Sequence, residues 1–370
     1  MNSPAWCFQC SACGERFPLD KPRAMCDCGA VLDCKPPPGK FPSPPTSRTA
    51  GLGRYAGILP LPAGRRPLLQ LGEGGTPLLE ERFGDRRLFL KVESTQPTGS
   101  FKDRGYVLLV NHLSGWGVGE VVGDSSGNAA CSLAAYCALA GIRATLYVPS
   151  RISTGKLRLL ESFGAEVRRV PEGRSAARRL AVLEGRRTFY AGHVTHPLFL
   201  HGVKTIAYEI WAQMGKASPG TIVLPAGNGT LLLGLWLGFG ELLRTGSIRS
   251  CPKLIAVQAR SCAPLALAFQ RGEEGPVRID PEGTRAEGIA IPEPVRGKEI
   301  LRAVRDSGGR MVTVGEKEIE AAHRQLSRTG FLVEPTSAAA LAAATATAGP
   351  EEEPVVVILT GSGLKTLPAQ

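Results

Sequence analysis

Short apolar runs alternate with longer amphipathic segments along most of this 370-residue chain. Seven runs rich in valine, isoleucine and leucine have the length of strands, and helical patterns lie between them. They cover residues 88–92, 120–123, 143–148, 167–170, 221–224, 254–258 and 355–359. Because strands that alternate with helices pair in parallel and are covered by helices, this order predicts an α/β fold with parallel sheets.

A single lysine, Lys102, stands between small residues in the segment 97–105 and precedes a helix-forming run. A solvent-facing lysine needs no glycine and serine beside it, whereas a lysine that condenses with a cofactor aldehyde needs backbone room for a bound ring. A solvated lysine at a helix start is the plain alternative. The segment alone leaves both interpretations open.

Small polar residues also follow the predicted strand 120–123, where Ser125, Ser126 and Asn128 precede an alanine-rich helix. Backbone N–H groups at a helix start bind anions, which suits a substrate carboxylate. A plain strand, turn and helix with a serine cap has the same pattern. This segment is therefore compatible with a site without requiring one.

Glycine-rich turns follow two more of the predicted strands. The first turn consists of Ala226, Gly227, Asn228, Gly229 and Thr230. Its glycines allow successive N–H groups to surround a phosphate, and they equally allow an ordinary tight turn. The last strand delivers the hydroxyl of Thr360 into the second turn, close to the C-terminus.

Taken in this order, the segments resemble the threonine synthase branch of the β-family (fold type II) of pyridoxal phosphate enzymes. The resemblance covers nearly the whole chain. Its motifs lie at residues 72–78, 97–105, 123–130, 202–210, 226–230, 333–339 and 360–365. Seven matches in the family order leave little room for chance.

The resemblance implies two parallel-sheet lobes behind a small N-terminal ribbon. A lobe of residues 93–210 that carries Lys102 is inserted into a larger lobe of residues 37–92 and 211–370. Pyridoxal phosphate is expected to form a Schiff base with Lys102, with Asn128 at its ring hydroxyl, Thr360 at its ring nitrogen and residues 226–230 around its phosphate. By their chemistry, the candidate substrate contacts are Ser100, Ser125 and Ser126, followed by Lys156, Arg158 and Lys204.

The family reaction converts O-phospho-L-homoserine and water into L-threonine and phosphate by γ-elimination and β-addition. Two departures put this substrate in doubt. His196 and His201 stand where many threonine synthases carry other polar residues, and their roles as pocket or packing residues stay open. Residues 285–290 look closer to the dehydratases. The alternative is a serine/threonine dehydratase or a cysteate synthase type of enzyme.

Six of the ten cysteines lie within the first 34 residues. Cys10 and Cys13 form one pair and Cys26 and Cys28 a second, each ending beside a glycine, which is the spacing of two knuckles that hold one zinc ion. We expect a zinc ribbon over residues 1–36, in which Cys7 and Cys34 are substitute ligands, and then a proline-rich linker at 35–49. A disulfide-rich secreted module is the alternative, but no apolar signal peptide is seen, which favours the cytoplasm.

The formal net charge of +11 raises nucleic acid as a partner. The arginines are dispersed and lack interleaved aromatic residues, so a phosphorylated amino-acid substrate explains the positive field better. We expect no nucleic acid or membrane partner, and a homodimer because family members often dimerise. A non-catalytic ribbon scaffold is the remaining alternative, against which the intact Lys102, Asn128 and Thr360 argue.

Overall fold

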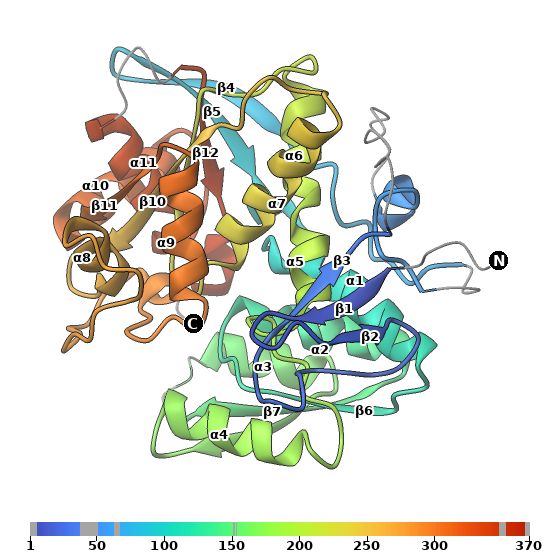
Figure 1. Ribbon diagram of the computed structural model, residues 1–370. Helices are drawn as coiled ribbons and strands as arrows, with labels where there is room; N and C mark the ends of the chain where they lie inside the picture. The colour runs from blue at the N-terminus through green and yellow to red at the C-terminus, as the bar shows by residue number, and fades with distance from the viewer. Residues whose placement is uncertain are drawn as a thin grey trace. The chain divides into compact units, whose positions relative to one another are not determined.

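The computed structural model describes residues 6–37, 51–62, 67–150, 152, 154–347 and 353–366 (Figure 1). Most of the expected linker at 35–49 lies outside these residues. The chain forms two compact units. Unit 1 comprises Met1–Gly74, Lys102–Val203 and Lys365–Gln370, and unit 2 comprises Gly75–Phe101 and Lys204–Leu364. These borders differ from the lobe borders expected from the sequence, and they place the ribbon and the helix of Lys102 in one unit.

Unit 1 contains two small sheets. The antiparallel ribbon has the strand order β2-β1-β3, with β1 (Cys7–Cys10), β2 (Arg16–Pro18) and β3 (Leu32–Lys35). The parallel sheet has the order β6-β7-β8, with β6 (Glu120–Gly123), β7 (Arg143–Pro149) and β8 (Glu166–Val170). The helical elements are η1 (Leu52–Tyr55), α1 (Lys102–Gly115), α2 (Asn128–Ala140), α3 (Thr154–Ser162), α4 (Arg174–Glu184) and α5 (Pro197–Val203).

Helices cover both faces of the parallel sheet in unit 1. Val122 and Tyr147 belong to a buried cluster with Ala177 of α4. Because successive strand residues point to opposite faces, Gly123 faces the other side, where an added Cβ would lie 3.0 Å from the side chain of Leu133 in α2. Burial on both faces explains why β6 and β7 read as apolar runs, whereas β8 lies at the sheet edge and is mostly exposed.

Unit 2 is built on one six-stranded sheet of order β11-β10-β9-β12-β5-β4, in which only the edge pair β4 and β5 is antiparallel among the described strands. The strands are β4 (Leu78–Phe83), β5 (Arg86–Val92), β9 (Thr221–Pro225), β10 (Lys253–Ala259), β11 (Arg310–Val314) and β12 (Val355–Leu359). The helical elements are η2 (Glu93–Thr95), α6 (Thr205–Gln213), α7 (Thr230–Arg244), α8 (Pro264–Gln270), η3 (Glu287–Ile289), α9 (Gly297–Asp306), α10 (Glu316–Arg328) and α11 (Pro335–Thr347), and η5 (Gly363–Thr366) spans the border between the units.

The core of unit 2 follows the alternation of its strands. Val355 and Val357 of β12 belong to one buried cluster that also contains Ala340 of α11, while Val356 and Ile358 are buried on the opposite face. The predicted α/β class and all seven predicted strands are confirmed. Among the described residues, no helix combines the length and the apolar character needed to cross a bilayer.

Candidate active site and metal centre

The residues expected to act lie in both units. Lys102, Asn128, Ser125 and Ser126 belong to unit 1, whereas Ser100, residues 226–230 and Thr360 belong to unit 2. Lys102 is joined directly to Phe101, the last residue of a unit 2 segment. We therefore describe the two sets in turn.

Lys102 is the first residue of α1 and is half-buried. Its Nζ atom lies 5.5 Å from the centre of the Phe199 ring. Burial, and secondarily the charge of Arg174, lower the pKa of Lys102 to about 7. An amine with this pKa is largely neutral at physiological pH, as a nucleophile and proton carrier must be.

The Ser-Ser-Gly-Asn loop leads directly into α2, whose first residue is Asn128. The Gly127 N–H donates to Ser125 Oγ at 3.2 Å, which closes the turn before the helix. The ammonium group of Lys365 donates a short hydrogen bond to Asn128 Oδ1. The C-terminal glycine motif thus contributes a cation to unit 1, a contact that sequence analysis did not anticipate.

Sequence analysis also missed a group of ionisable residues near Lys102. The hydroxyl of Tyr190 donates to Asp124 Oδ1 at 2.9 Å. Burial raises the pKa of Asp124, opposed by Tyr190 and by arginines of α4. Burial, with the charges of Lys102 and Arg174, holds the pKa of His193 well below its usual range. The position of Asp124 directly before the Ser-Ser-Gly-Asn loop was the signal that could have revealed this group.

In unit 2 the glycine turn between β9 and α7 leaves no room for larger side chains at two positions. A Cβ on Gly227 would lie 2.8 Å from the Gly288 carbonyl oxygen. Gly229 has φ +74°, and a Cβ there would lie 2.3 Å from Ile300. A glycine turn before a 15-residue helix is suited to an anion, because N–H groups at a helix start and the helix dipole favour negative charge.

Thr360 lies directly after β12 and is buried. Its Oγ1 atom lies 3.0 Å from Ser337 Oγ, which accepts the Gly361 N–H at 3.1 Å. The Phe101 N–H donates to the Thr360 carbonyl at 3.2 Å, and Ser100 pairs with Gly361 as an isolated bridge. Ser100 and Phe101, which precede Lys102, are therefore paired by backbone hydrogen bonds with the residues that follow β12.

These groups fit pyridoxal phosphate chemically. A desolvated lysine amine suits its aldehyde, a glycine turn at a helix start suits its phosphate, and a neutral hydroxyl suits a pyridine nitrogen. The three features are observed at Lys102, Gly229 and Thr360. Each unit, taken by itself, therefore presents groups that suit the cofactor that the sequence implies.

Two of the candidate substrate contacts, Lys204 and Lys156, are buried, which is not expected of a residue that binds substrate. Lys204 is fully buried, and its Nζ atom lies 2.9 Å from Glu241 Oε1. The Tyr208 hydroxyl donates to the other oxygen of the same carboxylate. Lys156 is buried in α3. The pair of Lys204 and Glu241 explains the burial of Lys204 without a ligand.

The cysteines of the ribbon form the second candidate site. The sulfur atoms of Cys10, Cys13, Cys26 and Cys28 all lie within 4.8 Å of one another, and the two close pairs are 3.5 and 3.6 Å apart. Sulfurs of a tetrahedral zinc site are about 3.8 Å apart, given zinc–sulfur bonds of about 2.3 Å. The N–H groups of Cys13 and Ala12 lie 3.4 Å from Cys10 Sγ and favour its thiolate. Cys7 and Cys34 stand outside this cluster.

Comparison with known proteins supports the resemblance. Residues 69–361 match the family described as pyridoxal-phosphate dependent enzyme. The chain is 34% identical to a threonine synthase of Methanocaldococcus jannaschii, over 96% of this chain and 92% of the relative. It is 35% identical to a threonine synthase of Methanosarcina acetivorans, over 84% and 79%. Among solved structures, a threonine deaminase from T.th. matches with a TM-score of 0.64 and 30% identity, over 78% of this chain and 92% of the other.

Proposed function

Because the chain belongs to the pyridoxal-phosphate dependent enzyme family, we propose that it is a threonine synthase, which converts O-phospho-L-homoserine and water into L-threonine and phosphate. The observation that carries this proposal is the likeness to threonine synthases over nearly the full chain. In the reaction the C–O bond at the γ carbon breaks and phosphate leaves, the γ carbon gains a proton to become a methyl group, and the β carbon gives up one proton and gains the hydroxyl of water. The bound cofactor supplies the electron sink for both changes.

Lys102 is proposed to move protons at the α and β carbons of the substrate. Its lowered pKa supports this role, because an amine with a pKa of about 7 both accepts and donates protons near neutral pH. The nearby charge of Arg174 favours a substrate that carries a phosphate. The start of α2, with Ser125 and Ser126, is proposed to bind the substrate carboxylate, and Ser100 is a further proposed contact.

The remaining proposed contacts are to the cofactor. Residues 226–230 hold its phosphate, and the Asn128 amide contacts its ring hydroxyl. Thr360 lies at the ring nitrogen, where a neutral hydroxyl does not enforce protonation as a carboxylate would. This weaker electron sink suits elimination and addition.

We further propose that Cys10, Cys13, Cys26 and Cys28 hold one structural zinc ion. The sulfur separations and the N–H groups directed at Cys10 support this assignment. The free thiols of the described chain suit a reducing compartment, so we propose a cytoplasmic enzyme. A homodimer without a nucleic-acid partner is the expected assembly, which light scattering with and without DNA tests.

A specific observation supports the second candidate, a serine or threonine dehydratase. The apolar ring of Phe199 lies beside the Lys102 amine, and a threonine deaminase is among the similar structures. An apolar ring at that position suits a substrate with a small, neutral side chain. A cysteate synthase type of enzyme is the third candidate function.

The deciding experiment offers the cofactor-loaded enzyme O-phospho-L-homoserine, O-phospho-L-serine, L-serine and L-threonine in parallel. Release of phosphate together with threonine from phosphohomoserine alone is the expected result. Keto acid from serine or threonine, or a sulfite-dependent product from phosphoserine, would replace the assignment with the corresponding alternative. Lys102→Ala serves as the inactive control in every reaction.

A further inference from the structure

The ribbon is packed against the same unit that carries Lys102. Phe8 of β1 is completely buried, with its ring 5.8 Å from His196 and 6.4 Å from Trp116. The indole N–H of Trp116 donates to the Leu19 carbonyl of the ribbon at 3.0 Å. Trp116 directly follows the last residue of α1, so the ribbon contacts the C-terminal end of the helix that Lys102 begins.

His201 makes the second polar link. Its Nε2 atom lies 3.0 Å from the Cys34 carbonyl of β3, and because a carbonyl only accepts, Nε2 is the donor. Trp6 packs edge-on against the same ring at 5.2 Å. His201 belongs to α5, and His196 immediately precedes that helix, so both histidines face the ribbon.

Helix α5 is in turn packed tightly against α1. A Cβ on Gly202 would lie 1.9 Å from the Arg104 carbonyl, so the two backbones touch. A Cβ on Gly105 would lie 2.4 Å from the Phe199 ring. The same ring lies 5.5 Å from Lys102 Nζ. A small shift of α5 would therefore change the surroundings of the Lys102 amine, because close-packed glycine contacts cannot absorb it.

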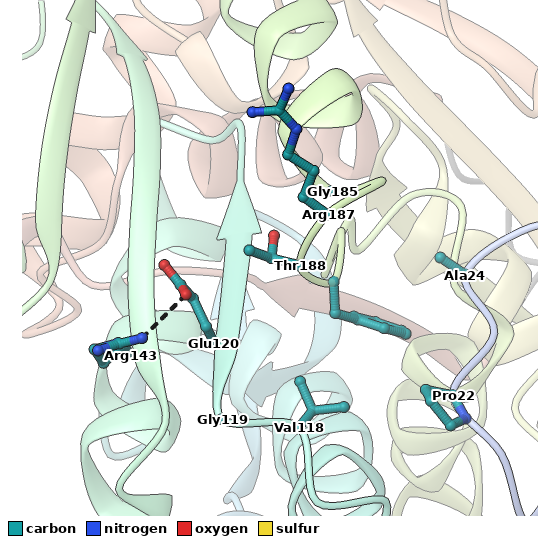
Figure 2. Close-up of a pocket in the computed structure, with 10 residues that line it drawn as sticks. Pro22, Ala24, Val118, Gly119, Glu120, Arg143, Gly185, Arg187 and Thr188 are labelled. Atoms are coloured by element: carbon teal, nitrogen blue, oxygen red, sulfur yellow. Dashed lines mark hydrogen bonds and ion pairs between the residues drawn. The ribbon is translucent and has the colours of Figure 1, made fainter.

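Figure 2 shows a cavity with Pro22 and Ala24 of the ribbon on one wall and Glu120 and Arg143 of the lobe on the other. Its volume is about 550 Å³. Phe189, which also lines this cavity, packs against His196 at 5.8 Å. The aromatic and histidine contacts therefore couple the position of α5 to the position of the ribbon.

We infer that the ribbon positions the active lysine, and that His201 is the positioning residue through which β3 fixes α5 and holds Phe199 against Lys102. This inference rests on the proposed role of Lys102 but not on the identity of the substrate. It also explains the two histidines before the Gly-x-Lys-Thr motif as an adaptation to the ribbon. His196 supports the same contact through its stacking on Phe8.

The test measures the pH dependence with which a small acylating reagent labels Lys102 in full-length, cofactor-free protein, quantified by mass spectrometry. Wild-type labelling is expected to have its midpoint near pH 7. In His201→Ala the amine should become better solvated, and a midpoint one pH unit higher lowers labelling at pH 7 about fivefold. His201→Gln retains an N–H donor and should restore labelling to within about twofold of wild type.

His323→Ala is the matched control, because His323 Nε2 also bonds a backbone carbonyl, that of Val333 at 2.8 Å, in unit 2. Its labelling midpoint should equal that of the wild type. An unchanged midpoint in folded His201→Ala would overturn the inference. If that variant does not fold, chelation of wild-type protein that elemental analysis has shown to hold the ribbon metal replaces it: a raised midpoint supports the inference, and an unchanged one overturns it. Because no substrate is used, failure of the proposed reaction leaves this test intact.

Discussion

The ammonium group of Lys365 is hydrogen-bonded to the side-chain oxygen of Asn128. A lysine can only donate, so this bond fixes which end of the amide faces Lys365 and leaves the NH₂ group as a donor in the other direction. A donor is what the ring hydroxyl of the proposed cofactor requires of Asn128. The residue from the end of the chain therefore orients a residue at the start of α2.

Replacing Lys365 by methionine should weaken cofactor binding, because the Asn128 amide would lose the hydrogen bond that Lys365 donates to its oxygen. We expect about a tenfold higher dissociation constant, equivalent to about 1.4 kcal/mol. Fluorescence titration of the cofactor-free chain measures this change. Lys317→Met, at an exposed position of α10, should bind the cofactor like the wild type. Equal affinity in both variants would show that Lys365 does not orient Asn128.

Lys102→Met should stabilise the cofactor-free protein in a pH-dependent way. The pKa of Lys102 is about 7 in the folded chain and about 10.5 when unfolded, so keeping this lysine charged in the folded state costs stability below pH 7. That cost fades between pH 7 and 10.5 and is absent above it. The gain in melting temperature should therefore be largest at pH 6 and small at pH 10. A gain of equal size at both pH values would contradict the lowered pKa.

Single Cys→Ser substitutions should distinguish the zinc ligands from the other cysteines of the ribbon. Cys13→Ser and Cys26→Ser are expected to lose the single equivalent of zinc and to melt at lower temperature, because metal binding contributes to the folding of small ribbons. Cys7→Ser should retain the metal, since Cys7 lies outside the four-sulfur cluster. Elemental analysis of the purified variants decides this. Zinc loss in Cys7→Ser would mean that the ligand set is wrong.

Lys204→Met should destabilise the protein rather than weaken substrate binding. It removes the 2.9 Å partner of the Glu241 carboxylate, which is 1% exposed, and leaves only Arg244 at 3.9 Å; breaking such a buried pair costs about 3 kcal/mol. Urea denaturation measures the loss in the free energy of unfolding. The exposed pair of Arg143 and Glu120 is the control, for which Arg143→Met should cost less than about 1 kcal/mol. A raised KM with an unchanged free energy of unfolding would instead show that Lys204 contacts the substrate.

Most of the seven strands were predictable because they are local runs of apolar residues that need burial on both faces; β8, an edge strand with two arginines, was indicated only by its valines. The sequence did not indicate β4, whose consecutive Glu80, Glu81 and Arg82 mask the strand pattern. This polar edge strand is stabilised by hairpin pairing with β5, in which Phe83 lies opposite Arg86, so it forms without an apolar pattern of its own. The ribbon cysteines were found because their spacing is itself local.

The sequence by itself determined the fold class, the glycine turns and the position of the candidate lysine, Lys102, since these depend on periodicity and on residues adjacent in the chain. Only the tertiary structure decided the environments of the polar side chains. His201 bonds Cys34 from 167 residues away, Lys204 is paired with Glu241, and Lys365 with Asn128. The physical reason is that burial, pairing and pKa are set by neighbours in space, which a pattern along the chain does not specify.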